Sequence, residues 1–313
     1  MNIKKIGMTA LAASLVSTSV FAGELTATGS ASLTVENYSG VAQNAGIAYS
    51  MADSVTLGGS TELDNGMTVS MSFELDSDNP SGSSYDNKSM TVSSDALGTF
   101  VFAGHGGSSA VSAIDATAAG DIFDNFDGKI GTAESVIANG DAAMQSTAAG
   151  DNSMLYTLPS VMDDLSLSAS YAPKGAGNES SAAFAGTYTG VEGLSVSYGQ
   201  GTNNSAVGTA FDADVSSMKA SYAIGSFTLA YSDHEFDSAT STRDQDTTSM
   251  SLAYTVSDAI SISYGTEEID SGETTVDAEY SQINASYTAG GMTITAKTQE
   301  AENISYSNAS QED

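Results

Sequence analysis

The segment Leu165-Ser-Leu-Ser-Ala-Ser-Tyr171 places serine at every second position, between leucine, alanine and tyrosine. A period of two residues puts apolar side chains on one face of a β-strand and polar side chains on the other. The same alternation recurs at Met67–Phe73, Leu194–Tyr198, Met250–Tyr254 and Ile260–Tyr264. No convincing helical stretch separates these segments, which excludes a βαβ architecture and leaves a sandwich, barrel, propeller or solenoid.

The connections between the expected strands alternate between short turns and longer polar loops. Asp64-Asn65-Gly66 is the clearest short turn, because Asn-Gly is a strong hairpin signal. The expected strands are 25–36, 46–63, 67–75, 88–93, 99–104, 152–158, 165–172, 182–189, 194–201, 213–223, 226–236, 246–256, 259–269, 275–289 and 292–302. Short turns on one side and long loops on the other are typical of an all-β transmembrane antiparallel barrel. A sandwich would scatter its loop lengths, and a solenoid would repeat at a fixed period.

An odd number of strands leaves a barrel with an unpaired edge. Unsatisfied backbone groups at such an edge cost several kcal/mol each in hydrocarbon (about 2–7 per group). We therefore expect 16 strands with the last one missing from this chain, since Ser310–Asp313 cannot be that strand. The alternative is that the barrel closes in a way that differs from this count.

The composition fits a hydrated barrel. The 313 residues have a net charge of −31, no cysteine, and only 40% hydrophobic residues. A barrel with a polar interior needs only one apolar face per strand, which explains the low hydrophobicity. The acidic balance argues against nucleic-acid binding and favours attraction of cations, with a solvated acidic surface as the alternative.

The N-terminus has the features of a signal peptide over residues 1–22. Lys4 and Lys5 precede an apolar, small-residue stretch from Ile6 to Val20, and cleavage is expected between Ala22 and Gly23. Residues 23–313 would then form one C-terminally incomplete barrel in an outer membrane, in contact with its lipid. A membrane anchor is the alternative for the first 22 residues.

Seven tyrosines lie a few residues from the short turns. An interfacial girdle needs an aromatic body in lipid and a hydroxyl in water, which tyrosine supplies. The predicted girdle consists of Tyr171, Tyr198, Tyr222, Tyr231, Tyr254, Tyr264 and Tyr287. On the opposite face of the strands, Lys219 and Lys297 are expected to point into the lumen, either paired with loop carboxylates or hydrated.

Residues 106–151 are the longest segment without a strand pattern. A loop of this length in so regular a chain is usually functional, and we expect it to fold into the lumen and narrow the pore. The predicted constriction residues are Asp115, Asp121, Asp124, Asp127 and Glu134 with the base Lys129. Carboxylates at a narrow point raise the local concentration of cations, although a solvated loop is the alternative.

No cofactor is expected, and no enzyme. The three-residue spacing of Asp121, Asp124 and Asp127 leaves Ca²⁺ binding open, but it does not match an EF-hand loop. His105 and His234 are the two histidines, and neither has a nucleophile nearby in sequence. A hydrolase would need a Ser–His–acid set, which the sequence does not indicate.

The chain resembles the general diffusion porins of Gram-negative bacteria, and most closely those of the alphaproteobacterial type. The resemblance is carried by Gly23-Glu-Leu-Thr26, by the long stretch after the fifth strand, and by Asn152-Ser-Met-Leu-Tyr-Thr-Leu-Pro159. It implies a 16-stranded barrel that forms a homotrimer, with the third outer loop bent inward as a constriction. That loop corresponds to residues 106–151 here.

The leading hypothesis is a passive channel for small hydrophilic solutes and ions that prefers cations. A second hypothesis is a secreted or surface structural or adhesive β-protein. A third is a substrate-specific outer-membrane channel, which would usually show an aromatic ladder along the pore, and the sequence has none that we recognise. Resistance of the fold to SDS until boiling separates the first hypothesis from the second.

Overall fold

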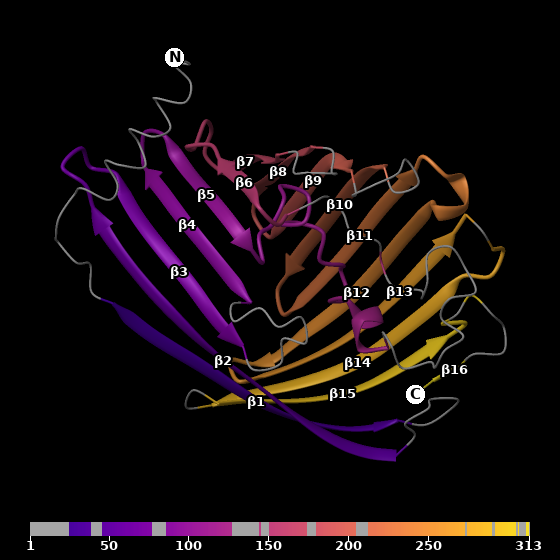
Figure 1. Ribbon diagram of the computed structural model, residues 1–313. Helices are drawn as coiled ribbons and strands as arrows, with labels where there is room; N and C mark the ends of the chain where they lie inside the picture. The colour runs from indigo at the N-terminus through magenta and orange to yellow at the C-terminus, as the bar shows by residue number, and fades with distance from the viewer. Residues whose placement is uncertain are drawn as a thin grey trace.

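The computed structural model describes residues 25–38, 46–76, 86–126, 144, 150–173, 180–204, 212–272, 274–289, 292–304, 306 and 311–312. These residues form one antiparallel sheet in which every strand pairs with the next strand in sequence order. The sheet curves round a hollow, as the wall of a barrel does (Figure 1). Residues 1–22, assigned above to a signal peptide, lie outside the described residues.

Fifteen strands have five residues or more, and a sixteenth is a short pair of residues. They are β1 (Thr26–Tyr38), β2 (Gly46–Glu62), β3 (Thr68–Asp76), β4 (Asn87–Ser94), β5 (Gly98–His105), β6 (Ser153–Thr157), β7 (Leu165–Ala172), β8 (Ser181–Val191), β9 (Leu194–Asn203), β10 (Ala213–Ile224), β11 (Phe227–Ser238), β12 (Gln245–Ser257), β13 (Ile260–Ser271), β14 (Ala278–Ala289), β15 (Met292–Glu302) and β16 (Gln311–Glu312).

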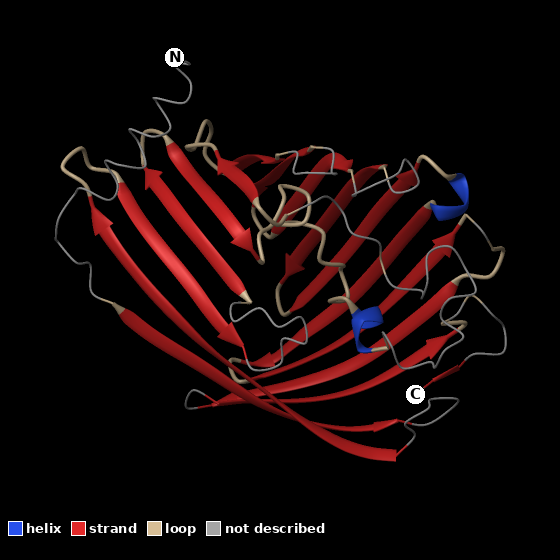
Figure 2. Ribbon diagram, in the orientation of Figure 1, coloured by secondary structure: helices blue, strands red, loops and turns tan. Residues whose placement is uncertain are grey.

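The helical content of the described residues is confined to two 3-10 turns. These are η1 (Ile122–Asn125) and η4 (Ser241–Arg243), drawn blue in Figure 2. Neither is long and apolar enough to cross a membrane. The prediction of an all-β chain is therefore confirmed.

The predicted strand boundaries agree with the structure within a few residues, and β7 and β15 match at both ends. The largest difference is at the start of β14, which begins at Ala278 rather than at residue 275. A turn occupies the intervening residues: Thr274 N donates to Ser271 O at 3.1 Å, and Thr274 Oγ1 donates to Val276 O at 3.0 Å. These bonds give the backbone an alternative to the sheet.

Alternation divides each strand into two faces. Tyr231 pairs with Met250 on the outer face, and the next residues along, Ser232 and Ser249, pair on the inner face. Leu229 is 52% exposed outward, whereas Ser232 is fully buried inward. The apolar residues therefore cover the outside of the curved sheet and the hydroxyls line its inside, as the two-residue period predicts.

The sheet is open between its first and last strands in the part of the chain that the structure describes. There β1 pairs only with β2. A cavity of about 1190 Å³ separates the edges, lined by Ser32 and Thr34 of β1 and by Asn284 and Lys297 of β14 and β15. The two-residue period therefore predicts the individual strands but does not predict how the edge at β1 is paired.

The chain after β15 contains one element that the sequence analysis did not predict. Gln311 and Glu312 pair with Glu302 and Ala301, where no further strand was expected from the terminal residues. A turn closed by the bond from Tyr306 N to Asn303 O, at 2.6 Å, precedes this pairing. These two residues do not form a strand that spans the wall, as the sequence analysis expected of the terminal residues.

Candidate functional site: the segment inside the barrel

Residues Gly106–Phe126, hereafter the inner segment, leave the wall after β5 and lie inside the curved sheet (Figures 1 and 2). The segment starts with Gly106 in the left-handed region, at φ 61°. Ser109 and Ser112 then exchange hydrogen bonds, from Ser109 N to Ser112 Oγ at 2.6 Å and from Ser112 N to Ser109 Oγ at 3.0 Å. Such side chain–backbone bonds favour turns over strands.

Apolar side chains of the inner segment pack on the wall at two places. Near its start, Ala110 and Val111 are fully buried against alanines of β8 and against Val215 of β10. Near η1, Ile122 and Phe123 pack with Ile269 of β13 in a second cluster that includes Phe126 and Tyr280. Burying each large apolar side chain stabilises this position by about 1.5–3 kcal/mol.

Between these clusters, wall side chains bind the backbone of the inner segment. The Ala118 N–H donates to Ser232 Oγ at 2.8 Å, and the Ala118 carbonyl accepts from Ser251 Oγ at 2.7 Å. The Ala119 N–H donates to Ser249 Oγ at 2.9 Å. These serines lie on the inner faces of β11 and β12, so the hydroxyls that make the wall polar also hold the segment.

The two inward lysines bind the same segment. Lys219 Nζ on β10 donates to Ala116 O at 2.7 Å and to Thr117 O at 3.2 Å. Lys297 Nζ on β15 donates to Asn125 Oδ1 at 3.0 Å. The sequence analysis allowed ion pairs with loop carboxylates or hydrated charges; the structure instead gives bonds to carbonyl and amide oxygens.

Three of the six predicted constriction residues lie on the inner segment. Asp124 is exposed, and Asp115 and Asp121 are partly buried. Asp121 Oδ1 accepts from Thr117 N at 2.8 Å, and the Asp121 backbone has φ 54°. The other three, Asp127, Lys129 and Glu134, lie outside the described residues.

Glu267 of β13 is a site residue that the sequence analysis missed. Its side chain is 2% exposed, and its two carboxylate oxygens accept from Thr117 Oγ1 and from Phe123 N, the latter at 3.1 Å. Alternation within β13 carries the signal that it faces inward, since Tyr264 three residues earlier faces outward. The sequence alone does not show which segment of the chain this carboxylate binds.

His234 also has a partner that the sequence analysis did not find. His234 Nδ1 and Ser217 Oγ are 2.6 Å apart, between β11 and β10, although 17 residues separate them in sequence. Both side chains are buried, at 2% and 1% exposure, and His234 Nε2 has no hydrogen-bond partner among the residues that the structure describes. The sequence analysis searched only for a nucleophile nearby in sequence and therefore did not find this pair, which is closed to solvent.

The seven predicted girdle tyrosines all face outward and are between 37% and 51% exposed. Tyr222, Tyr254 and Tyr287 lie two or three residues before the ends of β10, β12 and β14. Tyr198 and Tyr231 lie deeper into their strands and donate to Gln200 Oε1 and Asp233 Oδ2, both at 3.0 Å. Their role at a membrane interface remains a prediction.

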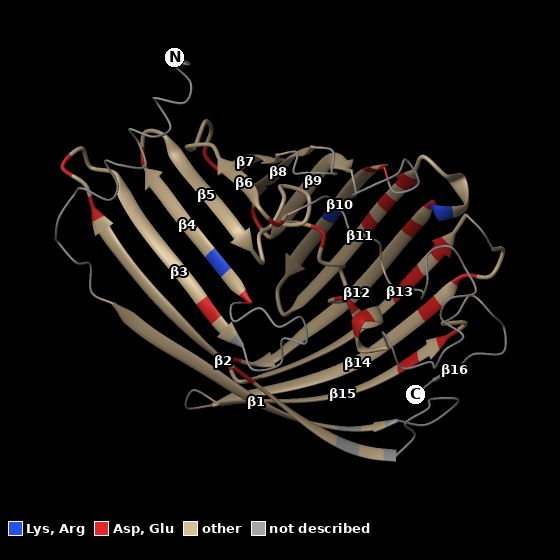
Figure 3. Ribbon diagram, viewed as in Figure 1, with Lys and Arg blue, Asp and Glu red and all other residues tan. Residues whose placement is uncertain are grey.

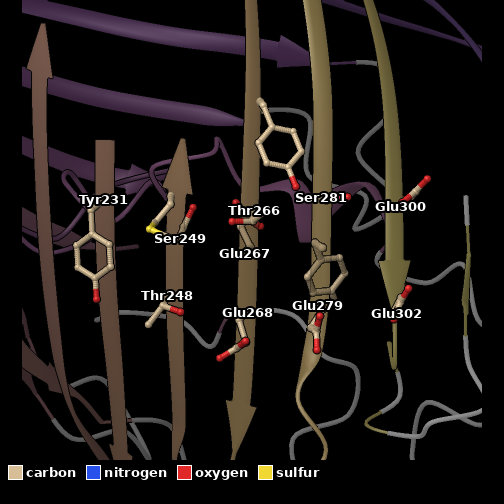
Figure 4. A pocket seen from close by; sticks show the side chains of 13 residues that line it. Tyr231, Thr248, Ser249, Thr266, Glu267, Glu268, Glu279, Ser281, Glu300 and Glu302 are labelled. Carbon is tan, nitrogen blue, oxygen red and sulfur yellow. The ribbon is translucent and has the colours of Figure 1, made fainter. Parts of the chain in front are cut away.

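Acidic residues that the sequence analysis did not distinguish from those of the loops follow the tyrosines on the outer face of the sheet. Figure 3 marks acidic positions along these strands in red. This outer acidic band consists of Asp214, Asp233, Glu235, Asp237, Asp246, Glu268, Asp270, Glu279, Glu300 and Glu302. Asp246 is directly opposite both Glu235 and Asp270. Figure 4 shows the continuation of the band on β13–β15, where Glu279 is opposite Glu268 and Glu302.

No group of three or more His, Asp or Glu side chains is placed to hold a metal ion among the residues that the structure describes. Asp127, one of the three aspartates for which Ca²⁺ was left open, lies outside them. Calcium binding therefore stays an untested prediction.

These features define a class of protein: a transmembrane β-sheet wall, apolar outside and polar inside, with a segment fastened within it. The solved structures most similar to this fold include a porin refined at 1.8 Å, with a TM-score of 0.63 and 19% identity over 89% of this chain and 94% of that chain. An anion-selective porin from Comamonas acidovorans has a TM-score of 0.64 and 14% identity over 89% of each chain. Salmonella typhi OmpF has a TM-score of 0.65 and 11% identity over 93% of this chain and 95% of that chain.

The family model for Gram-negative porins matches residues 7–308. The chain belongs to the Gram-negative porin family, and it is an outer-membrane channel protein. No curated protein sequence matches the chain. The porin part of the resemblance is thus confirmed, and the porin fold indicates a channel rather than an enzyme.

Proposed function

We propose that this porin, of the alphaproteobacterial type, is a passive diffusion channel for small hydrophilic solutes and ions, and that it prefers cations. The observation that supports the cation preference is that the ammonium groups of the two inward lysines are bonded to the inner segment. Lys219 and Lys297 both direct Nζ at oxygens of the inner segment, at 2.7 Å and 3.0 Å. Asp115, Asp121 and Asp124 lie on that same segment, so among the residues that the structure describes its carboxylates outnumber the ammonium groups that contact it.

Carboxylates on the inner segment favour cations because the water path beside them is narrow and has low-dielectric walls. A carboxylate beside a constricted aqueous path attracts cations and repels anions more strongly than the same group in bulk water. Lys219 and Lys297, which are bonded to the segment, partly offset this field. The net charge of −31 adds a long-range potential of the same sign.

The test is conductance of the purified, folded protein in planar bilayers. Stepwise currents that grow with salt concentration support passive diffusion, whereas saturable block by one solute would support the substrate-specific alternative. Replacing Asp121 and Asp124 by asparagine should lower the potassium-to-chloride permeability ratio by about twofold or more. Asp258→Asn, in an exposed short turn, is the matched control and should leave the ratio unchanged.

We also propose a homotrimer that assembles through the outer face of β1–β6. This face carries exposed apolar side chains, including Met51 at 62% and Met71 at 48%. Phe100 and Tyr156 stack there with ring centroids 4.2 Å apart. The outer acidic band lies on β10–β15, so the outer face of β1–β6 is free of that band. Cross-linking of protein extracted in mild detergent should give a trimer; monomers alone would contradict the proposal.

A further inference from the structure

Thr117 is the centre of the hydrogen bonds that shape the inner segment. Its hydroxyl donates to Glu267 Oε1. The same oxygen accepts from Gly120 N at 3.1 Å and from Asp121 N at 2.7 Å. Thr117 N donates in turn to Asp121 Oδ1 at 2.8 Å. Thr117 therefore connects the wall to both the backbone and the carboxylate of Asp121.

The direction of the Thr117 hydroxyl proton follows from this arrangement. A hydroxyl has one proton to donate and two lone pairs with which to accept. The Glu267 carboxylate can only accept, so the proton points to the wall and the lone pairs point to Gly120 N and Asp121 N. The hydroxyl thus uses its proton and both lone pairs, and these hydrogen bonds close the tight turn in which Asp121 has φ 54°. A non-glycine residue in this region needs such support.

Glu267 is fixed in its turn. Its side chain is 2% exposed, and its second oxygen accepts from Phe123 N at the start of η1. Ile122 and Phe123 are buried beside it. The Glu267 carboxylate thus binds Thr117 before Asp121 and Phe123 after it. The chain on both sides of Asp121 is therefore bonded to β13.

We propose that Glu267 and Thr117 are positioning residues for ion selectivity: they hold the Asp121 carboxylate in place on the inner segment. This inference rests on the proposed cation preference and assigns its control to a wall carboxylate that does not itself line the water path. Neither residue needs to meet the permeating ion. Loss of their contact should let Asp121 move and should weaken the selectivity that it provides.

The decisive variant is Thr117→Val, because it keeps the shape of the side chain and changes no charge. It removes the donor to Glu267 and the acceptor for Gly120 N and Asp121 N. The potassium-to-chloride permeability ratio should fall by about twofold, as for Asp121→Asn alone, and the single-channel current should fluctuate more. Thr117→Ser restores the hydroxyl and should restore the wild-type ratio.

A second variant, Glu267→Gln, tests the other end of the contact. Glutamine has one acceptor oxygen and an NH₂ group, so one of the two donors, Thr117 Oγ1 or Phe123 N, loses its acceptor. The permeability ratio should fall. Combining Glu267→Gln with Thr117→Val should give less than the sum of the two single effects, because without the Thr117 hydroxyl the one remaining acceptor oxygen can serve Phe123 N. Heat-modifiable migration on SDS gels checks that each variant has folded.

The outcomes separate this inference from the proposed function. A wild-type channel without cation preference overturns the proposed function and this inference with it. A wild-type preference that Asp121→Asn lowers and Thr117→Val leaves unchanged overturns only the positioning role. Fully additive effects of Thr117→Val and Glu267→Gln would also overturn it, since independent sites add and coupled ones do not.

Discussion

Small residues on the wall decide how closely the inner segment can approach it. Gly265 of β13 faces inward, and a Cβ atom at this position would lie 2.6 Å from Ala119 Cβ and 3.2 Å from Ala119 Cα. Such a contact is too close, so one of the two backbones would have to shift. The polar tethers of Ala118 and Ala119 therefore depend on glycine at position 265.

Gly265→Ala should push the inner segment away from the wall and into the lumen. We expect a lower single-channel conductance, because the segment would then take up more of the open cross-section. Gly59→Ala on β2 is the control, since a Cβ there meets nothing within 4 Å. Conductance in planar bilayers measures both variants, and equal conductance for Gly265→Ala and the wild type would contradict the packing described for Ala119.

The lysines provide a second test of single residues. Lys219→Met keeps a side chain of similar length but removes the ammonium group that Ala116 O and Thr117 O accept from. The cation preference should rise, because a positive charge beside the segment is lost. Lys88→Met is the control, because Lys88 is exposed and lies opposite Phe73 on the outer face of β4. A lower preference for Lys219→Met would show that Lys219 acts mainly by holding the segment.

The outer acidic band places like charges on neighbouring strands. Like charges placed directly opposite each other on neighbouring strands are destabilising. Asp246 of β12 has a carboxylate opposite it on both sides, Glu235 and Asp270. The sheet therefore contains a local electrostatic conflict that its hydrogen-bond register does not relieve.

Asp246→Asn should stabilise the folded protein at low ionic strength by about 0.2–1 kcal/mol, since the loss of this one charge removes two repulsive pairs at once. Salt should reduce the gain, because screening weakens the repulsion in the wild type as well. Unfolding by urea from lipid vesicles at low and high salt measures the difference. The turn variant Asp258→Asn serves as the reference, and destabilisation by Asp246→Asn at low salt would contradict this account of the band.

Strands were predictable from this sequence because a half-lipid, half-water wall demands a strict period of two. β7 and β15 match residue for residue, and the turn at Asp64–Gly66 has Gly66 at φ 78°, as an Asn-Gly hairpin predicts. The start of β14 was not predictable, because a side chain–backbone turn at Thr274 competes with the strand. Periodicity carries no information about that competition.

The site was predictable only in its location. The break in alternation after β5 identified the inner segment, and acidic residues on it identified Asp115, Asp121 and Asp124. The contacts of Glu267, Thr117 and Lys219 join residues more than 100 positions apart, and Ser217 meets His234 across two strands. A two-residue period predicts the face on which a side chain lies, but it does not predict which loop atoms the side chain contacts there.

At the scale of the whole molecule, the wall, the segment within it and the distribution of charge combine into one claim: a water-filled outer-membrane channel that favours cations. The direct measurement is the reversal potential of the folded, detergent-extracted protein in a planar bilayer under a KCl gradient. We predict stepwise conductance with a reversal potential of the sign that potassium flux sets. A reversal potential at zero or of the chloride sign, from protein that conducts, would contradict the claim.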